Sequence, residues 1–304
     1  MLDVMVNRAR RVNAAVRRTQ VKRHSMWTPL PGSAEASALC AIARCASGPS
    51  IDPTFRVTVN FHPDRKAGDL SLLQVLAKDG VLRSQFETRT SNGGLTAFEG
   101  GARWRWESRI FSGSYDIELP SRRPKYGALN HRRRSVGGSP RFGSSHFRLC
   151  PHVLERTTFC YPDSFFEPTH FGNASNMGLI DKCESDECDE LDRYIEAHVH
   201  GPVSLSQDVE ALVLDECYRG TQVSVDAMNL PVRVEWHTGF RVSIATIRRF
   251  PEYRGEPTVK VADTLAVDGW ITPAHLGAAA VSGEYSYDDL KKVWHYVARF
   301  AITE

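Results

Sequence analysis

The segment at residues 194–203 reads YIEAHVHGPV, and its first six residues decide how this part of the chain folds. Polar and apolar residues alternate over 194–199, which is the period of a β-strand with one face on a hydrophobic core. The apolar residues at 195, 197 and 199 face that core, so Glu196 and His198 lie on the other face. Glu196 is then either a solvated carboxylate or, flanked by histidines on a rigid strand, a catalytic group.

Working outward, the flanking sequence predicts further strands and a few helices. Hydrophobic alternation and β-branched residues predict strands over 55–61 and 209–214, a pair of strands over 232–236 and 240–244 around Thr238-Gly239, and extended structure over 81–86. Helical spacing of apolar residues predicts helices over 69–78 and at the C-terminus, where Ser286 is the expected N-cap. Strand pairs with few helices predict an α+β fold, with a mixed or antiparallel sheet and flanking helices.

Length and composition exclude several classes of protein. The chain has 304 residues, 41% of them hydrophobic, and a net charge of +2, which is too hydrophobic and too balanced for a wholly disordered chain. No run approaches the ~18 apolar residues of a membrane span. Seven scattered cysteines favour a reducing compartment. We expect a basic N-terminal helix and linker over 1–51 and a single α+β domain over 52–304.

The small net charge conceals strongly charged segments. Residues 101–156 carry twelve Lys and Arg against four acids, whereas residues 163–216 carry fourteen acids against two basic residues. Two interpretations remain open. The segments are solvated or attract each other within the fold, or the basic segment contacts phosphates of a dinucleotide or a nucleic acid.

Several motifs of common enzyme classes are absent from the sequence. It has no G-x-S-x-G, no G-x-x-x-x-G-K and no strand-anchored G-x-G-x-x-G, which argues against serine hydrolases, P-loop enzymes and Rossmann dehydrogenases. No Cys-x-x-Cys pair occurs, so we expect no metal site. The acidic run at residues 184–192 lacks the spacing of a calcium loop and is expected to be solvated.

Seven segments resemble a bacterial family of conserved proteins of unknown function. They lie within residues 52–300 and read NFHPDR, LRSQFETRTSNGGLTA, RPKYGALN, GSPRFGSSHFRL, RTTFCYPDS, YIEAHVHGPV and WHYVARF. This resemblance implies membership of that family but does not indicate which reaction or ligand the protein has.

The order of elements also resembles that of ADP-ribosyltransferases. In those enzymes a strand ending in His or Arg is followed by a helix, a glycine-hydrophobic strand, a Ser/Thr loop and, much later, a Glu on a strand. Here the same order is given by His62, the helix over 69–78, residues 80–84, the loop over 88–92 and Glu196. The sequence departs from the pattern because it has no Ser-Thr-Ser triplet and no Glu-x-Glu pair.

The resemblance implies a split sheet and an enzyme that uses NAD as a substrate. It implies that Glu196 is catalytic, because a carboxylate stabilises the positive charge that develops when the glycosidic bond breaks. The remaining residues that it assigns to NAD are His62, Arg65, Arg83, Ser84, Thr90, Ser91, Asn92 and Tyr126. His62 is otherwise a surface or capping histidine, and Phe142 and Tyr161 are further candidates to stack on nicotinamide.

The expected function is therefore transfer of ADP-ribose to a macromolecule, most simply a protein, by a toxin or secreted effector. The protein would act in the cytoplasm or after secretion into a host cell. A nucleic-acid-binding protein that uses Arg132, Arg133 and Arg134 and a non-catalytic interaction protein are the alternatives. If Glu196 and His62 share a cleft, the enzyme is favoured.

Overall fold

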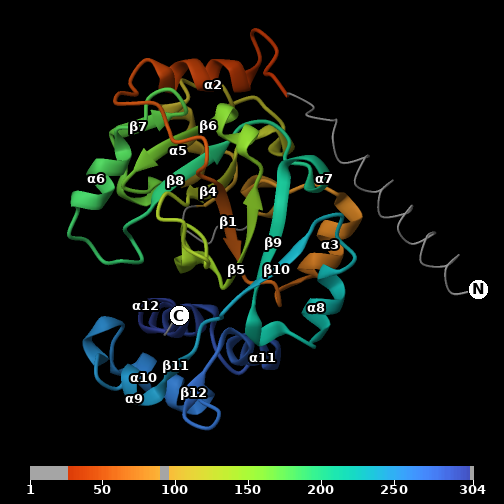
Figure 1. Ribbon diagram of the computed structural model, residues 1–304, viewed down its shortest axis with the longest axis vertical. Helices are drawn as coiled ribbons and strands as arrows, with labels where there is room; N and C mark the ends of the chain where they lie inside the picture. Colours follow the sequence, from red (N-terminus) through yellow and green to blue (C-terminus); the bar gives the residue numbers. More distant parts are fainter. Residues whose placement is uncertain (1–26, 90–95, 302–304) are drawn as a thin grey trace, which may run out of the picture.

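The protein folds around one eight-stranded sheet (Figure 1). The computed structural model describes residues 27–89 and 96–301. The strand order is β10-β9-β5-β1-β4-β8-β6-β7; β9 and β10 are parallel and every other neighbouring pair is antiparallel. The strands are β1 (Val57–Phe61), β4 (Lys125–Leu129), β5 (Ser145–Leu149), β6 (Thr157–Tyr161), β7 (His170–Asn173), β8 (Ile195–Val199), β9 (Val209–Asp215) and β10 (Val234–His237). The expected α+β fold with a mixed sheet and flanking helices is confirmed.

The sheet opens between β1 and β4. These strands pair only at Val57↔Leu129 and Thr58↔Ala128. Beyond that point β1 continues to pair with β5 and β4 continues to pair with β8. The loop that follows β4 is bonded to the β1 side of the opening, where the Thr58 hydroxyl accepts from the Gly138 amide at 2.8 Å and the Asn60 amide donates to the Val136 carbonyl at 2.9 Å.

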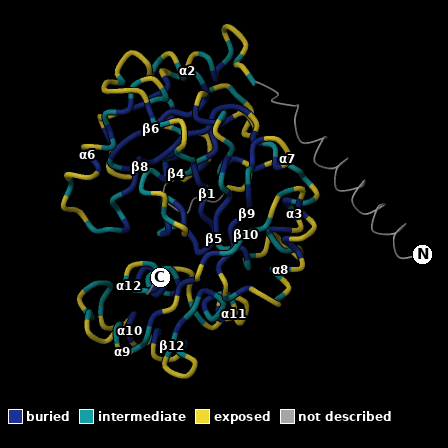
Figure 2. The backbone as a smooth tube through the Cα atoms, in the orientation of Figure 1, coloured by how far each residue is buried: buried dark blue, intermediate teal, exposed yellow. Residues whose placement is uncertain are grey.

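Helices cover both faces of the sheet, which leaves its strands in the buried centre of the molecule (Figure 2). One face forms the main core with α3 (Leu72–Asp79) and α6 (Leu179–Ser185). The other face packs against α2 (Ala34–Ala43) and α5 (Ala102–Ile110). The helix α2 lies upstream of residue 52, yet its apolar residues are buried together with those of α5 and β6.

The alternation predicted for residues 194–199 is confirmed, but both faces of the strand are buried. Ile195, Ala197 and Val199 belong to the main core. On the opposite face Glu196 is 6% exposed and His198 is 1% exposed. The cover comes from α5, whose Trp106 ring centroid lies 5.1 Å from that of His198. The expectation of a solvated Glu196 is therefore wrong, because a helix from a distant part of the sequence covers this face.

The C-terminal third forms a second hydrophobic cluster beside the sheet (Figure 1). Its residues come mainly from α9 (Ile244–Ile247), α10 (Glu256–Leu265), α11 (Pro273–Ser282), α12 (Tyr287–Phe300) and the short strands β11 (Val242–Ser243) and β12 (Trp270–Ile271). The predicted C-terminal helix is confirmed, since α12 begins after the N-cap Ser286 and buries its apolar side.

Two local predictions from the sequence are wrong. The strands expected over 232–236 and 240–244 do not pair with each other: β10 pairs with β9, and β11 pairs with β12. Between them the chain leaves the sheet at Gly239, which has a φ of 89°. The segment expected to be extended over 81–86 has only one bridge, at Val81, and then forms α4 (Gln85–Thr88), because Ser84 and Glu87 form a capping box.

The remaining short elements connect these parts. They are β2 (Lys66–Ala67), β3 (Leu70–Ser71), α7 (Leu205–Asp208) and α8 (Gln222–Ala227). Among the described residues, no helix has the length and apolar character required to cross a membrane.

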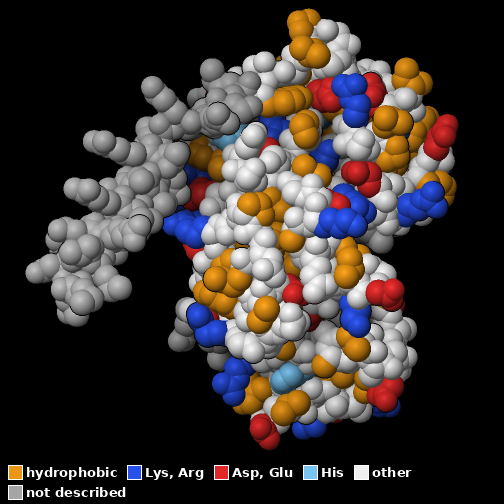
Figure 3. Space-filling view, turned by 90° about the vertical axis from the view of Figure 1, so that its right-hand side faces the viewer, with side chains coloured by type: hydrophobic (Ala, Val, Ile, Leu, Met, Phe, Trp, Pro, Cys, Tyr) orange, Lys and Arg blue, Asp and Glu red, His pale blue; other side chains and the backbone are white. Residues whose placement is uncertain are grey.

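The basic segment and the acidic segment meet within the fold. Arg132 lies 2.7 Å from Glu184 and 3.0 Å from Glu190, and Arg134 also pairs with Glu190. On the face of the molecule in Figure 3, acidic and basic side chains are interspersed. These contacts support intramolecular attraction as the reason for the opposite charges of the two segments.

Candidate functional site

A large cavity lies between the opening in the sheet and the C-terminal helices. Its volume is about 1160 Å³, and it is lined by residues of β1, α3, β4, β8, α11 and α12. Six of the residues selected from the sequence line it, namely His62, Arg65, Arg83, Tyr126, Phe142 and Glu196. Ligand sites commonly have volumes of about 300–1,000 Å³, so this cavity has room for a large ligand.

The sheet topology explains why residues so far apart in sequence meet here. In the paired part of the sheet, Ala128 of β4 lies between Thr58 of β1 and Glu196 of β8. His62 follows the end of β1, and Tyr126 lies on the part of β4 that no longer pairs with β1. The opening between β1 and β4 therefore gives the cavity access to Glu196.

Glu196 is held by three side chains from different elements. Its Oε1 atom lies 3.0 Å from His198 Nε2 and 3.7 Å from Arg103 Nη1, and its Oε2 atom accepts from the Ser164 hydroxyl at 2.9 Å. Burial alone would raise the pKa of this carboxyl. The hydrogen bond from His198 and the charge of Arg103 outweigh burial, so the pKa is lowered and Glu196 is ionised.

Behind Glu196 runs a chain of buried hydrogen bonds. His198 Nδ1 lies 3.1 Å from Thr158 Oγ1, which lies 3.0 Å from His200 Nε2, and His200 Nδ1 lies 2.7 Å from Tyr115 Oη. Burial lowers the pKa of both histidines, so both are neutral. Every donor in the chain then has an acceptor if Tyr115 donates to His200, His200 to Thr158, Thr158 to His198 and His198 to Glu196.

His62 lies at the side of the cavity formed by the C-terminal helices. Its ring meets Trp294 of α12 edge-on, with 4.7 Å between ring centroids. Burial, together with the nearby charge of Arg65, lowers the pKa of His62 to about 3. The ring is therefore neutral near pH 7 and offers one donor and one acceptor for hydrogen bonds.

The cavity carries an excess of positive charge. Eight Lys and Arg residues and five acidic residues line it. Arg83 pairs with Asp79 at 2.6 Å, and Arg65 donates to the Tyr287 hydroxyl at 3.2 Å while its guanidinium lies over the Tyr287 ring. Such a lining attracts an anionic ligand, because the walls exclude part of the solvent that would screen the charges.

The other residues selected from the sequence have different outcomes. Ser84 does not line the cavity: it caps α4, and its hydroxyl donates to the Pro120 carbonyl at 2.6 Å. The structure does not support the assignment of Ser84 to NAD, because its hydroxyl already accepts one hydrogen bond and donates another within the fold. Thr90, Ser91 and Asn92 lie outside the described residues.

Tyr126 lines the cavity but already has partners. Its hydroxyl donates to Glu107 at 2.8 Å, and the Arg103 guanidinium lies 4.1 Å from its ring centroid. One face of the ring is thus covered by a side chain that also pairs with Glu196. Tyr126 therefore helps to position the catalytic candidate as well as to line the cavity.

Three residues at the site were not identified from the sequence: Arg103, Ser164 and Trp294. Arg103 lies on α5 and Ser164 begins the 3-10 helix over Ser164–Phe166, and both approach Glu196 only in the folded chain. The sequence offers one signal for Trp294, a tryptophan on the apolar side of an amphipathic helix, which by itself predicts a core residue.

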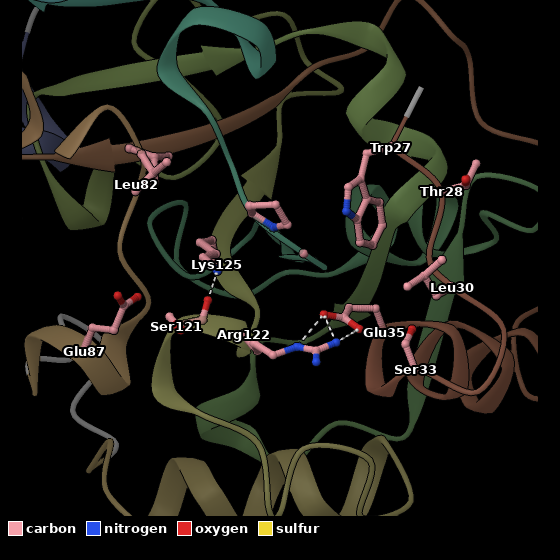
Figure 4. Close-up of a pocket in the computed structure, with 13 residues that line it drawn as sticks. Trp27, Thr28, Leu30, Ser33, Glu35, Leu82, Glu87, Ser121, Arg122 and Lys125 are labelled. Atoms are coloured by element: carbon pink, nitrogen blue, oxygen red, sulfur yellow. Dashed lines mark hydrogen bonds and ion pairs between the residues drawn. The ribbon is translucent and has the colours of Figure 1, made fainter. Parts of the chain in front are cut away.

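A second, smaller cavity of about 410 Å³ also has Lys125 in its lining (Figure 4). In it the carboxylate of the buried Glu35 pairs with Arg122 at 2.8 Å, and Trp27 lies opposite this pair. Lys125 lines both cavities; its amine donates to the Ser121 carbonyl at 2.7 Å, and burial lowers its pKa to about 8. Only the larger cavity contains the predicted catalytic carboxylate.

Comparison with known proteins agrees with the first of the two resemblances. No curated protein matches the chain. One family model matches residues 56–180 and 169–300, which together cover most of the sequence and include every described residue selected for the site. The sheet, the large cavity and the C-terminal helices that close it all lie within this match, and the chain therefore belongs to the family described as "Protein of unknown function (DUF3626)".

Proposed function

We propose that this protein is an ADP-ribosyltransferase-like enzyme that uses NAD as a substrate and transfers ADP-ribose to a macromolecule. One observation carries the proposal: an ionised, buried glutamate on β8 shares a large, positively charged cavity with the histidine at the end of β1. This combination, reached through an opening between β1 and β4, corresponds to the residue order and the split sheet expected from the resemblance.

The proposed reaction assigns Glu196 to the ribose. The bond between ribose and nicotinamide breaks, and nicotinamide leaves with the electron pair of that bond. The ribose develops positive charge, which the fixed carboxylate stabilises. A nucleophilic atom of the acceptor then bonds to the ribose carbon and releases its proton to water.

The other residues of the cavity would bind and orient NAD. Arg65 and Arg83 line the cavity, and their guanidinium groups would pair with the pyrophosphate. The neutral His62 would hydrogen-bond to ribose hydroxyls. Tyr126 supports the proposal less directly, because Arg103 covers one face of its ring.

The alternative of nucleic-acid binding has less support. The Arg132–Arg134 triplet is engaged in ion pairs, with Arg133 bonded to Asp52 at 2.9 Å in addition to the pairs with Glu184 and Glu190. A nucleic acid remains a candidate acceptor, which the experiment below distinguishes from a protein.

The test is incubation of the purified full chain with NAD labelled in its adenylate part and a cell lysate. We expect labelled product and release of nicotinamide with the wild type. Protease treatment should destroy the label if the acceptor is a protein, and nuclease treatment should destroy it if the acceptor is a nucleic acid. A folded wild-type protein that neither binds nor cleaves NAD would refute the proposal.

Two variants make the test specific. Glu196→Gln should lower the rate of NAD cleavage by at least about 100-fold, the loss typical of removing one electrostatic stabiliser. Arg65→Ala combined with Arg83→Ala should weaken NAD binding instead. Glu216→Gln is the matched control, because Glu216 is exposed and pairs with Arg219 outside the cavity. Equal loss of activity in all three variants would count against the assigned roles.

A further inference from the structure

We propose that Cys160, Glu196 and His198 form a binding site for a Zn²⁺ ion. The three side chains lie on the neighbouring strands β6 and β8, where Cys160 is paired directly with Glu196. They offer a thiol sulfur, a carboxylate oxygen and an imidazole nitrogen, the three kinds of atom that bind zinc in proteins. All three side chains are buried.

The distances between the donor atoms suit a tetrahedral ion. Cys160 Sγ lies 3.9 Å from Glu196 Oε1 and 3.8 Å from His198 Nε2, and these two atoms are 3.0 Å apart. Zinc bonds of about 2.0–2.3 Å in a tetrahedron place ligand atoms about 3.3–3.7 Å apart. Shifts of a few tenths of an ångström are therefore enough to receive the ion.

The residues around the donors hold them in the required orientation. The second nitrogen of His198 lies 3.1 Å from Thr158 Oγ1, and the second oxygen of Glu196 accepts from Ser164. Histidine ligands commonly bond through their other ring nitrogen in this way. When zinc takes Nε2, the His198 proton resides on Nδ1 and is donated to the Thr158 oxygen.

The local charge also accommodates the ion. Burial raises the pKa of the Cys160 thiol, so the thiol is protonated without metal and releases one proton to water on binding. Zinc with one thiolate adds one positive charge. Arg103 repels that charge, but the carboxyl groups of Glu196 and Glu107 lie near enough to Arg103 to offset part of its own charge.

Zinc at this position would occupy the Oε1 atom of Glu196. Provided that the proposed function holds, the ion is an inhibitor, because it neutralises the carboxylate that stabilises the ribose cation. Binding of the ion does not depend on that function. The two ideas can therefore fail separately.

The test is a titration of the reduced full chain with Co²⁺, which takes zinc sites and absorbs in the near ultraviolet when a thiolate binds it. We expect one equivalent to produce the thiolate band, and Zn²⁺ to displace it. Cys160→Ser should abolish the band, and His198→Gln should weaken binding at least tenfold. The matched control is Cys183→Ser, since Cys183 lies with His131 and Glu184 in the other such group within residues 27–89 and 96–301.

The outcomes distinguish this site from the group formed by His131, Cys183 and Glu184. A band that persists in Cys160→Ser, or that disappears in Cys183→Ser, would overturn the proposal. Thermal unfolding checks that the variants fold: without metal, the Tm of Cys160→Ser should stay near that of the wild type. Zinc at about 100-fold above its Kd should raise the wild-type Tm by about 5 °C and leave that of Cys160→Ser unchanged.

Discussion

His198 Nε2 and Glu196 Oε1 lie 3.0 Å apart, and both side chains are buried on the face of β8 that α5 covers. The two residues are separated by one position on a strand, so they point to the same side. Burial keeps His198 neutral, and its single N–H is directed at the carboxylate. This contact fixes one oxygen of Glu196, while the Ser164 hydroxyl fixes the other.

Glu196→Gln should change how stability depends on acid. The pKa of Glu196 is lowered from 4.5 in the folded protein, so its contribution is complete above pH 4.5 and is lost as the pH falls through the folded-state value. The variant leaves Arg103 without this partner and should lose about 3 kcal/mol at pH 7. Urea unfolding between pH 3 and 7 checks this. The variant should lose less stability than the wild type on acidification below about pH 4.5, and parallel curves would contradict the assignment.

His146→Leu should make the protein less sensitive to acid. His146 is buried on β5, its Nδ1 atom has no hydrogen-bond partner within the described part of the chain, and burial lowers its pKa to about 3. A group whose pKa is lowered on folding takes up its proton in the unfolded state first. Between pH 6.5 and 3 it therefore reduces stability by up to about 1.4 kcal/mol per pH unit as the pH falls. Unfolding of the variant should take up one proton fewer in this pH range, so its free energy of unfolding should fall less steeply with pH than that of the wild type. An unchanged slope would show that His146 is not the group responsible.

Trp294→Ala should detach the C-terminal helices from the sheet side of the cavity. The Trp294 ring is buried between His62 and Phe240, and its N–H donates to the Pro140 and Arg141 carbonyls at 3.1 and 3.0 Å. Loss of a buried tryptophan costs about 3–5 kcal/mol. Trp294→Phe, which keeps a ring but no donor, should cost less. Calorimetry measures both, and equal losses would show that ring burial contributes nothing here.

Gly277→Ala should destabilise the protein, although alanine is the better helix former. In an ordinary helix the exchange would stabilise by up to about 1 kcal/mol. Here a Cβ atom at residue 277 of α11 would overlap the carboxylate of Asp64, which is bonded to Tyr218 at 2.9 Å. Combining Gly277→Ala with Asp64→Ser should recover much of the loss, because the serine side chain is shorter. A stabilised Gly277→Ala single variant would contradict the close approach.

Local patterns in the sequence determined several parts of the site. The period of two in 194–199 identified the strand and the side on which Glu196 lies, because side-chain direction in a strand depends on position alone. The end of β1 placed His62, and the spacing of apolar residues identified α12 with its cap at Ser286. These features rest on contacts between residues close in sequence.

Predictions failed where residues distant in sequence compete for the same groups. The resemblance assigned Ser84 to a loop that binds NAD. In the structure its hydroxyl caps α4 and donates a hydrogen bond to the Pro120 carbonyl. The strand β10 pairs with β9 and not with β11. The chain leaves the sheet at Gly239, so β11 lies outside the sheet and pairs with β12. The choice of β9 as the partner of β10 is not visible in a local pattern, whereas the capping box of Ser84 and Glu87 is a local pattern that the strand prediction passed over.

The sequence alone therefore identified β1, β8, β9, β10 and α12, and the side of β8 on which Glu196 lies. Only the tertiary structure decided that Glu196 is buried and ionised rather than solvated, because Arg103 and Ser164 approach it from elements 93 and 32 residues away in the chain. It also decided that β1 and β4 separate after two pairs and leave a cavity. The direction of a side chain on a strand follows from local sterics. Its burial and its ionisation state depend on how distant segments pack around it.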